Sequence, residues 1–514
     1  MILFSSATTL KSESTSGKRG PAGSSVAVAA CCFLVALPWL WPLLYGPKNE
    51  LWPNLVAWSS GAALFVLLPW TRERAAIAIA TGWLLAATVS AAIGLLQFFD
   101  LENKFSPWVL LTRPGDVLAN VHQVNLLATL LGAGLLSLWW MVTNRRLKPF
   151  LASTIAVLLI TSLAATASRT GMLHAILVSG LLLYWGRLDR RVAVAVAVGL
   201  LLYALAAVCL PWLQQTLGVA SGRDLVSRFA VTSPCSSRKV IWSNVLQLIS
   251  MKPWTGWGWD GLAYAHYITP YDGLRFCEKL SNAHNLPLQL AVSIGLPMAL
   301  LMILTLMLFV LKFKPWNAQE SSEQLAWGVL LLLGLHSMLE YPLWFGVPQL
   351  MAICAVWLIW RSNRKNLAGM SELFIIFSSF PVRAALSALA LAGLTYVAWD
   401  YFKVTQLFLT SVDRHESYRS ETLKKVGKSW LFQSYVLYAV VNTTKVDAAN
   451  ASLVLDAALE VLKDFPDPEI IIKVIEAGNM NGETSLVELH TERFRAAWPK
   501  EFSEWSAARL REAK

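Results

Sequence analysis

Hydrophobic positions along this chain form long runs, and short connections rich in charged residues and Pro separate them. A helix of about 20 apolar residues crosses the ~30 Å hydrocarbon core of a bilayer, and most of the runs approach that length. The pattern therefore predicts about eleven membrane-spanning helices. The predicted spans are residues 26–45, 51–70, 75–99, 121–142, 150–167, 172–185, 192–210, 286–311, 325–339, 343–360 and 382–402.

The composition supports an all-α, polytopic integral membrane protein. Hydrophobic residues make up 56% of the chain and charged residues 15%, with a mean hydropathy of +0.51, whereas soluble domains carry about 25% charged residues. The 24 Trp residues suit a protein that meets two water–lipid interfaces, where such rings accumulate. Residues 1–25 lack the apolar core and cleavage site of a secretory signal, so we expect an N-terminal tail and a retained first span.

The basic residues alternate between two sets of connections. One set carries about sixteen Lys and Arg residues and the other about four, so the positive-inside rule places the richer set in the cytoplasm. The richer set consists of Lys11, Lys18, Arg19, Arg72, Arg74, Arg145, Arg146, Lys148, Arg187, Arg190, Arg191, Lys312, Lys314, Arg361, Arg364 and Lys365, and the poorer set of Lys48, Lys104, Arg113 and Arg169. With about eleven crossings, the N-terminus is cytoplasmic, whereas the C-terminus and a long loop at 211–285 lie outside.

Two regions follow the N-terminal tail. Residues 26–410 are expected to form the transmembrane domain, which includes the large outer loop. In 411–514, the ranges 430–441, 448–464 and 469–477 show helical periodicity with charged faces. Two or three short helices of this kind resemble a tetratricopeptide pair, although no repeat period is visible. We expect a small helical domain outside the membrane.

The net charge of +11 bears on the kind of ligand. The excess lies in the membrane part, and the chain has no arginine-rich arm or aromatic platform for bases, which excludes nucleic acid as a partner. The outer loop concentrates Arg223, Arg228, Arg238 and Lys239 at the bilayer surface. These cations favour a lipid-linked anion as the ligand.

Cys235 and Cys277 both fall in the outer loop. Because that loop faces an oxidising compartment, we expect a disulfide between them, and two unpaired thiols are the alternative. On the chain-entropy account, closing a loop of this length contributes about 4 kcal/mol. The bond would also fix Arg238 relative to His284.

His284 is the candidate for proton transfer. Pro287 is a helix-start signal, so His284 lies just before the first turn of a span, at the outer membrane boundary. An imidazole there changes protonation near neutral pH and can accept a proton from a hydroxyl. The alternative is a helix-end histidine with only local hydrogen bonds.

Charged groups near the outer boundary are candidates for binding an anion. Arg169 lies in a tight outer turn and Arg238 precedes an amphipathic segment that runs to Ile249. Two converging guanidinium groups bind a pyrophosphate through paired hydrogen bonds, although either residue alone could be a solvated surface charge. Glu340 at the same depth needs a partner, for which an arginine or His284 is the natural candidate.

Several common catalytic and cofactor motifs are excluded. The segment Gly256–Gly261 matches the spacing G-x-G-x-x-G, but it follows no strand and opens no helix of a βαβ unit, so it is rejected as a nucleotide site; we expect its Trp residues to rest on the bilayer surface. The chain contains no H-E-x-x-H, P-loop, G-x-S-x-G or D-x-D motif, and no Cys/His set with zinc spacing. We therefore expect an enzyme without metal or other cofactor, in which arginines neutralise the developing charge.

A series of short motifs then occurs in a familiar order. They are Asn120-x-His122-Gln123-x-Asn125, Ser168-Arg169-Thr170-Gly171, Arg238-x-x-x-Trp242, Gly256-x-Gly258, His284-Asn285 and His336-Ser337-x-x-Glu340-Tyr341-Pro342-Leu343-Trp344. In this order and membrane placement, the chain resembles the bacterial O-oligosaccharyltransferases that glycosylate pilins, within the O-antigen ligase and O-antigen polymerase superfamily. The resemblance runs from about residue 38 to residue 360.

The resemblance implies a function and a location. It implies inverting, metal-independent transfer of a glycan from undecaprenyl pyrophosphate to a hydroxyl, at the periplasmic face of the bacterial inner membrane. His284 would activate the acceptor hydroxyl, while Arg169 and Arg238, with Arg228, would bind the pyrophosphate. The residues implied to line the site are Gln123, Asn125, Asn285, Glu340 and Tyr341.

The acceptor stays open at this point. A pilin or other periplasmic protein, the lipid A core and a growing O-antigen are all possible acceptors within the family, and the long loop and helical tail favour the protein. The competing class is a transporter of a lipid-linked anion. Against transport, the sequence shows no internal repeat and no paired broken spans.

Overall fold

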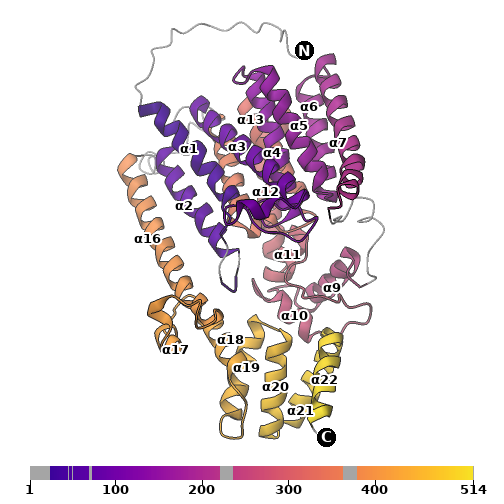
Figure 1. Ribbon diagram of the computed structural model, residues 1–514, viewed down its shortest axis with the longest axis vertical. Coiled ribbons are helices and arrows are strands. Elements are labelled where there is room, and N and C mark those ends of the chain that lie inside the picture. Colours follow the sequence, from indigo (N-terminus) through magenta and orange to yellow (C-terminus); the bar gives the residue numbers. More distant parts are fainter. Residues whose placement is uncertain are drawn as a thin grey trace.

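The computed structural model describes residues 23–43, 46–48, 50–68, 72–219, 235–362 and 379–512, and all regular structure in these ranges is helical (Figure 1). The α-helices are α1 (Gly23–Leu40), α2 (Leu51–Leu67), α3 (Arg72–Phe98), α4 (Val124–Thr143), α5 (Pro149–Ala165), α6 (Arg169–Trp185), α7 (Arg190–Thr216), α9 (Arg238–Met251), α10 (Leu262–Ile268), α11 (Leu286–Ile294), α12 (Leu296–Phe313), α13 (Ser321–Ser337), α14 (Gly346–Ser362), α16 (Phe380–Thr405), α17 (Thr422–Val426), α18 (Gln433–Thr443), α19 (Ala451–Asp464), α20 (Pro468–Asn481), α21 (Thr484–Ala497) and α22 (Pro499–Glu512). The predicted all-α class is confirmed.

Each predicted span overlaps at least one of these helices. Five stretches in the described residues are long and apolar enough to cross a membrane: Glu73–Phe98, Val124–Thr143, Arg190–Thr216, Leu296–Asn317 and Phe380–Phe408. Shorter apolar helices cover Ser25–Leu40, Leu51–Leu67, Pro149–Ala165 and Gly346–Ser362. An integral membrane protein is thus supported, and the total of about eleven crossings stays a prediction.

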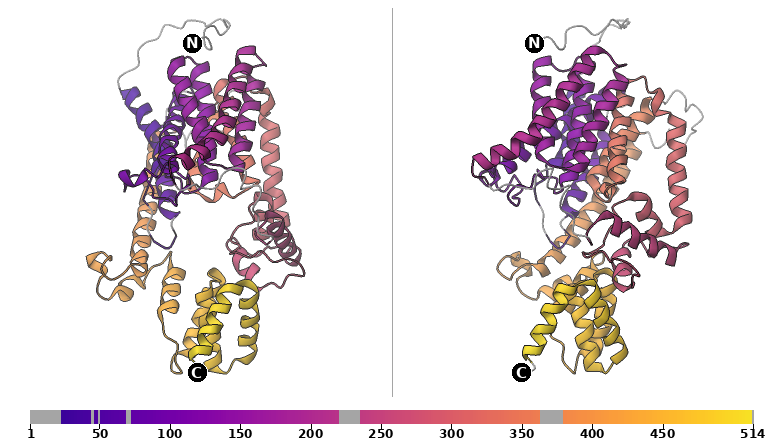
Figure 2. Two further views of the ribbon diagram at one scale, coloured as in Figure 1. Left: turned by 45° about the vertical axis from the view of Figure 1, so that its right-hand side comes forward. Right: turned by 90° about the vertical axis from the view of Figure 1, so that its right-hand side faces the viewer.

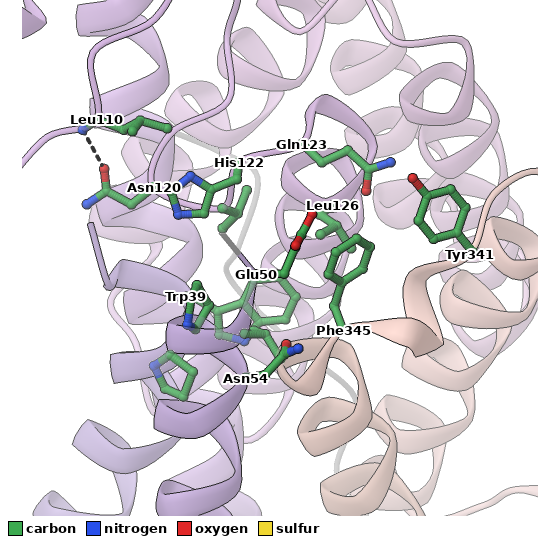
Figure 3. Close-up of a pocket in the computed structure, with 14 residues that line it drawn as sticks. Trp39, Glu50, Asn54, Leu110, Asn120, His122, Gln123, Leu126, Tyr341 and Phe345 are labelled. Atoms are coloured by element: carbon green, nitrogen blue, oxygen red, sulfur yellow. Dashed lines mark hydrogen bonds between the residues drawn. The ribbon is translucent and has the colours of Figure 1, made fainter. Parts of the chain in front are cut away.

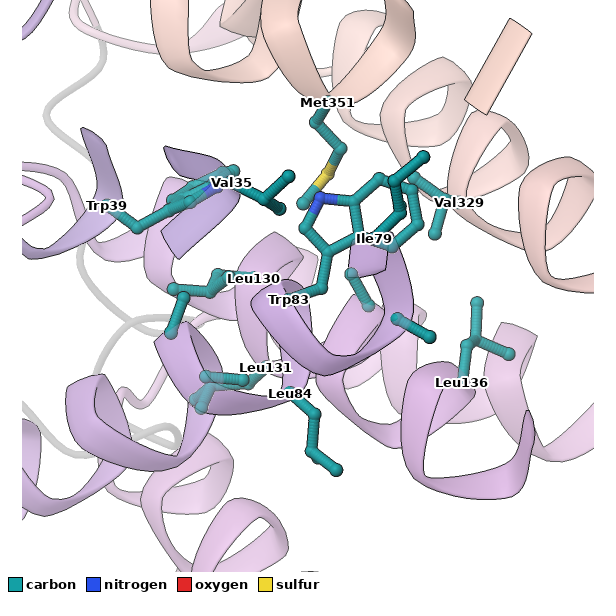
Figure 4. Packing of buried hydrophobic residues seen from close by; sticks show 14 of the residues in the cluster. Val35, Trp39, Ile79, Trp83, Leu84, Leu130, Leu131, Leu136, Val329 and Met351 are labelled. Carbon is teal, nitrogen blue, oxygen red and sulfur yellow. The ribbon is translucent and has the colours of Figure 1, made fainter. Parts of the chain in front are cut away.

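Helices α1, α3, α4, α13 and α14 pack into the hydrophobic core of the bundle. Figure 4 shows Trp83, Ile79, Leu130, Leu131 and Met351 among the side chains that meet there, and all of them are almost fully buried. Large apolar side chains from several helices interlock in this core. Such van der Waals packing holds the helices together, because lipid tails are as apolar as the side chains and give no hydrophobic driving force. The core therefore fixes how the ends of these helices lie relative to one another.

The bundle has two distinct ends. At one end, Arg146 pairs with Glu73 and the amide of Asn144 donates to Ser321 at 3.1 Å. We call this the basic end, because it gathers the described members of the richer basic set. At the opposite end, the N–H of Gly346 donates to the side chain of Asn54 at 2.7 Å. We call it the tail end, because the C-terminal helices lie beyond it in both views of Figure 2.

The expected span 286–311 is wrong as a single helix. Helix α11 ends at Ile294, and α12 begins at Leu296 after Gly295, whose φ of 81° lies in the left-handed region. The N–H of Leu296, which a continuous helix would bond internally, donates to the carbonyl of Pro253 at 2.7 Å. A turn from the long loop thus satisfies the backbone at the break, as any interruption near a membrane requires.

The Trp-rich turn lies against this break. The N–H of Trp257 donates to the carbonyl of Val292 at 2.8 Å, and its indole N–H donates to Leu248 at 2.9 Å. Trp254 and Trp259 are exposed, so the expectation of Trp residues at a bilayer surface stays open for these two. It also stays open for Trp257, whose hydrogen bonds hold it against α9 and α11.

Substitution of Gly295 by alanine is expected to destabilise the protein. An added Cβ would lie 2.2 Å from the carbonyl oxygen of Trp254, and the left-handed backbone is unfavourable for a side chain. Together these effects should lower the free energy of unfolding by more than about 1 kcal/mol. Gly180, in the middle of α6 with open space at its Cβ, is the matched control. Thermal unfolding in detergent should show a lower midpoint for Gly295→Ala, and equal midpoints for the two variants would contradict this account of the break.

The connection that follows residue 234 forms a small unit with its own core. Apolar side chains of α9, α10 and α11 gather around Val245, Leu248 and Val292. Cys235 and Cys277 form a disulfide with their Cα atoms 5.5 Å apart, and Arg238 begins α9 three residues after Cys235. The bond therefore joins the start of α9 to the stretch that leads into His284.

Replacing Cys277 by serine is expected to loosen this unit. The disulfide spans 42 residues of sequence, and losing such a cross-link costs about 4 kcal/mol on the chain-entropy account. We expect faster amide exchange in α9 by mass spectrometry, with the bundle core unchanged. Cys209→Ser, which alters an exposed free cysteine, is the control. Unaltered exchange in α9 would show that packing alone holds the unit.

The C-terminal region contains more helices than expected. The predicted ranges 430–441, 448–464 and 469–477 correspond to α18, α19 and α20, and α21 and α22 extend the same core. Helix α16 runs along the bundle and continues toward these helices (Figure 1). The hydroxyl of Tyr267 on α10 lies 2.8 Å from a ring nitrogen of His490 on α21, so the C-terminal helices pack on the unit that leads to His284.

Candidate active site

Glu340 is the centre of a polar network at the tail end. It follows the end of α13, where its N–H donates to the carbonyl of His336 at 2.8 Å. One carboxylate oxygen accepts from the guanidinium of Arg238 at 2.5 Å, and the other lies 2.5 Å from Nδ1 of His284. The amide of Asn125 at the start of α4 also donates to Glu340, at 3.3 Å. Three segments far apart in the sequence therefore meet on one carboxylate.

Backbone contacts on both sides fix the position of His284. The indole N–H of Trp242 on α9 donates to the carbonyl of Ala283 at 3.1 Å. On the other side, Asn285 caps α11 by accepting from Leu288, and its amide donates to the carbonyl of Met338 at 3.1 Å. His284 itself has a φ of 50°, an uncommon conformation for a residue with a side chain. Such backbone strain gathers at functional sites.

The electrostatics of the network define a protonation pattern. Burial by itself would raise the pKa of Glu340, but the hydrogen bond and charge of His284 and the charge of Arg238 hold that pKa below its usual value. Glu340 is thus a carboxylate and can only accept hydrogen bonds, so Nδ1 of His284 carries the proton between them. Whenever His284 has lost its second proton, Nε2 is a free acceptor, on a side chain that is 30% exposed.

Arg169 adjoins the network through Ser168. The hydroxyl of Ser168 donates to the side-chain oxygen of Asn125 at 2.7 Å. The same hydroxyl caps the N-terminus of α6 by accepting from the N–H of Gly171. Arg169 begins that helix, and its side chain is exposed. It makes no ion pair with any residue that the structure describes. A free guanidinium therefore stands beside a network whose other cation, Arg238, is already paired.

The pairing of Arg238 changes the expected picture. The sequence led us to expect two arginines for a pyrophosphate, and Arg238 instead holds Glu340. The hydrogen bond to Glu340 uses one of five guanidinium N–H donors, and the side chain is 30% exposed. Arg238 thus retains donors for an anion. Arg228 lies outside the described residues.

Tyr341 and Gln123 lie at the edge of the network. The ring of Tyr341 meets the ring of His284 edge-on, with centroids 5.1 Å apart. Burial, together with the carboxylates of Glu340 and Glu50, raises the pKa of Tyr341, so the phenol keeps its proton. Gln123 precedes α4 without capping it, and with Tyr341 it lines a cavity of about 350 Å³ (Figure 3). The site thus continues into this cavity.

Two side chains of this cavity had not been singled out from the sequence. Glu50 directly precedes α2, and Trp39 lies near the end of α1. The sequence gives only a weak indication that Glu50 is a site residue, namely a carboxylate in a short connection between two spans. It gives no indication for Trp39, because a tryptophan in an apolar run is ordinary core material. No group of three or more His, Cys, Asp or Glu side chains in the described ranges could hold a metal ion, and a metal-free reaction stays a prediction.

Two known families match different parts of the chain, and each match contains part of the network. The family described as O-Antigen ligase matches residues 154–303, which contain Arg169, Arg238 and His284. The family described as Virulence factor membrane-bound polymerase, C-terminal, matches residues 324–513, which contain Glu340 and Tyr341. Together these matches support a relationship to the O-antigen ligase superfamily. The resemblance noted from the motifs is confirmed.

Two curated proteins that this chain resembles come from Acinetobacter baylyi. A General O-oligosaccharyltransferase is 24% identical over 268 residues, which are 50% of this chain and 46% of the relative. A ComP-specific O-oligosaccharyltransferase is 24% identical over 266 residues, which are 51% of this chain and 47% of the relative. The matched stretches thus cover about half of the chain and about half the length of each relative. No solved structure matches.

Proposed function

We propose that this chain transfers an oligosaccharide from undecaprenyl pyrophosphate to a hydroxyl group of a periplasmic protein. The observation that carries the proposal is the network in which Glu340 orients His284 and pairs with Arg238, with the free Arg169 beside it. A base, its orienting carboxylate and cations for a leaving diphosphate are the groups that such a transfer needs.

The reaction is a single displacement at the anomeric carbon. Nε2 of His284 takes the proton of the acceptor hydroxyl as the oxygen forms its bond to that carbon. The bond from the carbon to the diphosphate oxygen breaks on the opposite face, so the configuration inverts. Arg169 and Arg238 stabilise the charge that develops on the diphosphate, and Glu340 stabilises the imidazolium. The proton then leaves His284 to water.

The proposed location is the inner membrane, with the tail end of the bundle in the periplasm. The basic end carries the connections that the positive-inside rule assigns to the cytoplasm, among them Arg145, Arg146 and Lys148. The network lies at the other end, and so do the C-terminal helices. This orientation places the site where the diphosphate of a lipid-linked donor meets water.

A protein is the preferred acceptor. Both curated relatives are named O-oligosaccharyltransferases, and one is named as specific for ComP. The helices α18–α22, which pack on the unit leading to His284, offer a surface on which a pilin or other folded acceptor can bind close to the site. The second candidate is transfer to the lipid A core or a growing O-antigen, which the descriptions of the two matched families favour.

One transfer assay distinguishes these functions. Purified protein in detergent is incubated with a defined undecaprenyl-pyrophosphate glycan and either a pilin or lipid A core, with and without EDTA. We expect the pilin to gain the mass of the glycan, equally with the chelator. A mass gain on the lipid A core alone would favour the second candidate, and loss of transfer with EDTA would contradict the metal-free reaction. No transfer to any acceptor, with movement of the lipid-linked glycan across vesicles, would point to the transporter.

A further inference from the structure

The cavity beside the network has walls from four parts of the chain. They are the end of α1, the start of α2, the stretch before α4 and the segment after Glu340 (Figure 3). Its volume of about 350 Å³ falls at the lower end of the usual range for ligand pockets, ~300–1,000 Å³. Tyr341 connects the polar network to the cavity, because its ring contacts His284 and it also lines the cavity. A group held here would lie next to the reacting atoms.

Polar atoms without partners belong to residues that line this cavity. The ring nitrogens of His122 and the amide oxygen of Gln123 are buried and make no hydrogen bond of normal geometry to a described residue, although the carbonyl of Trp41 lies close to the imidazole. A neutral imidazole offers one donor and one acceptor. Buried polar atoms are normally paired, so three unpaired ones around a cavity call for a polar ligand.

The backbone also marks His122. Its φ of 63° lies in the left-handed region, as does the φ of His284, and nothing but the surrounding structure holds a non-glycine residue there. Gln123, which follows it, adopts an extended conformation and makes no capping bond to α4. The two side chains are therefore not used to stabilise the helix start, where a polar residue usually has that role.

The rest of the lining combines aromatic rings with a carboxylate. Trp39, Tyr341 and Phe345 contribute rings, and Glu50 contributes a carboxylate that points into the same space in Figure 3. Sugar rings present C–H groups on their faces and hydroxyls around their edges. Flat aromatic rings pack against the C–H faces, and imidazole, amide and carboxylate groups hydrogen-bond to the hydroxyls.

We infer that this cavity binds the sugar residue that is joined directly to the diphosphate of the lipid-linked donor. The inference rests on the proposed function, because it uses the same site and adds the chemical class that the cavity recognises. His122 and Gln123 bind hydroxyl or acetamido groups of that sugar, and Tyr341 forms the cavity wall on the side of His284. The cavity thereby orients the anomeric carbon between the base and the leaving diphosphate.

Binding measurements with two short probes test this inference without any transfer step. The probes are farnesyl pyrophosphate and the same lipid carrying one N-acetylglucosamine, titrated calorimetrically into full-length protein in nanodiscs. The wild-type protein should bind the sugar-bearing probe at least tenfold more tightly than the bare one. Gln123→Leu and His122→Gly should each remove most of this difference and leave the affinity for farnesyl pyrophosphate unchanged. Glycine suits the left-handed backbone at residue 122, and Gln247→Leu, on α9 and outside the cavity lining, is the matched control.

The outcomes separate the two proposals. If farnesyl pyrophosphate does not bind, or binds independently of Arg169, the proposed function fails. If it binds through Arg169 but the advantage of the sugar is absent or survives both cavity variants, the proposed function stands and the sugar site is wrong. A cavity variant that weakens only the binding of an acceptor protein would likewise overturn the sugar site and assign the cavity to the acceptor.

Discussion

Replacing His284 by alanine is expected to lower the rate of glycan transfer by roughly 10²–10⁴-fold, the usual contribution of a positioned general base. The variant loses Nε2 of His284, which is the proposed base. Binding of the donor should change little, because Arg169 and Arg238 remain in place. The measurement is single-turnover transfer from a lipid-linked glycan, with donor affinity determined separately.

His415→Ala is the control for this prediction. His415 is exposed and lies in the segment after α16, where it accepts a hydrogen bond from Ser417. That variant should transfer at the wild-type rate. If His284→Ala also transfers at that rate, His284 is not the base. If it transfers slowly only because the donor no longer binds, its role is structural.

Replacing Glu340 by glutamine is expected to slow transfer by roughly 10- to 150-fold. A hydrogen bond to a charged group is worth about 1.5–3 kcal/mol, and each 1.36 kcal/mol changes a rate about tenfold. The amide no longer stabilises the imidazolium that forms at His284, and it leaves Arg238 without its charge partner. The loss should appear mainly in kcat and much less in the KM for the acceptor. A change in KM alone would show that Glu340 serves acceptor binding.

The pH dependence of stability gives a second readout for Glu340. Because its pKa is lowered on folding, the charged network stabilises the protein fully above the usual value of 4.5 and loses this contribution as the pH falls through the lowered value. The difference in unfolding midpoint between wild type and Glu340→Gln should therefore be largest near neutral pH and shrink below about pH 4.5. A constant difference would mean that the carboxylate is not charged in the folded protein.

Much of the site could be predicted from the sequence because its signals are local. The position of His284 just before a helix follows from Pro287, and the structure starts α11 at Leu286. The need of Glu340 for a charged partner follows from its depth, and both candidate partners, His284 and Arg238, contact it. These inferences rely on chemistry that one segment carries by itself.

The remaining features depend on segments that are far apart. The break at Gly295 exists because a turn some forty residues earlier supplies its backbone partner, Pro253, and hydropathy alone predicts a continuous span. The cavity joins Glu50 with Tyr341, and no local pattern links two residues that are so distant in sequence. Arg238 pairs with Glu340 because folding brings α9 over the end of α13. Such convergences require the tertiary structure.

The central claim is that Arg169, Arg238 and His284 act on one diphosphate-linked donor at the tail end of the bundle. The most direct test is a cryo-EM map of the protein in lipid nanodiscs with undecaprenyl pyrophosphate. The account predicts density for the diphosphate within hydrogen-bonding distance of Arg169 and Arg238, with its open side toward Nε2 of His284. Density for the diphosphate at the basic end, or anywhere away from these arginines, would contradict it.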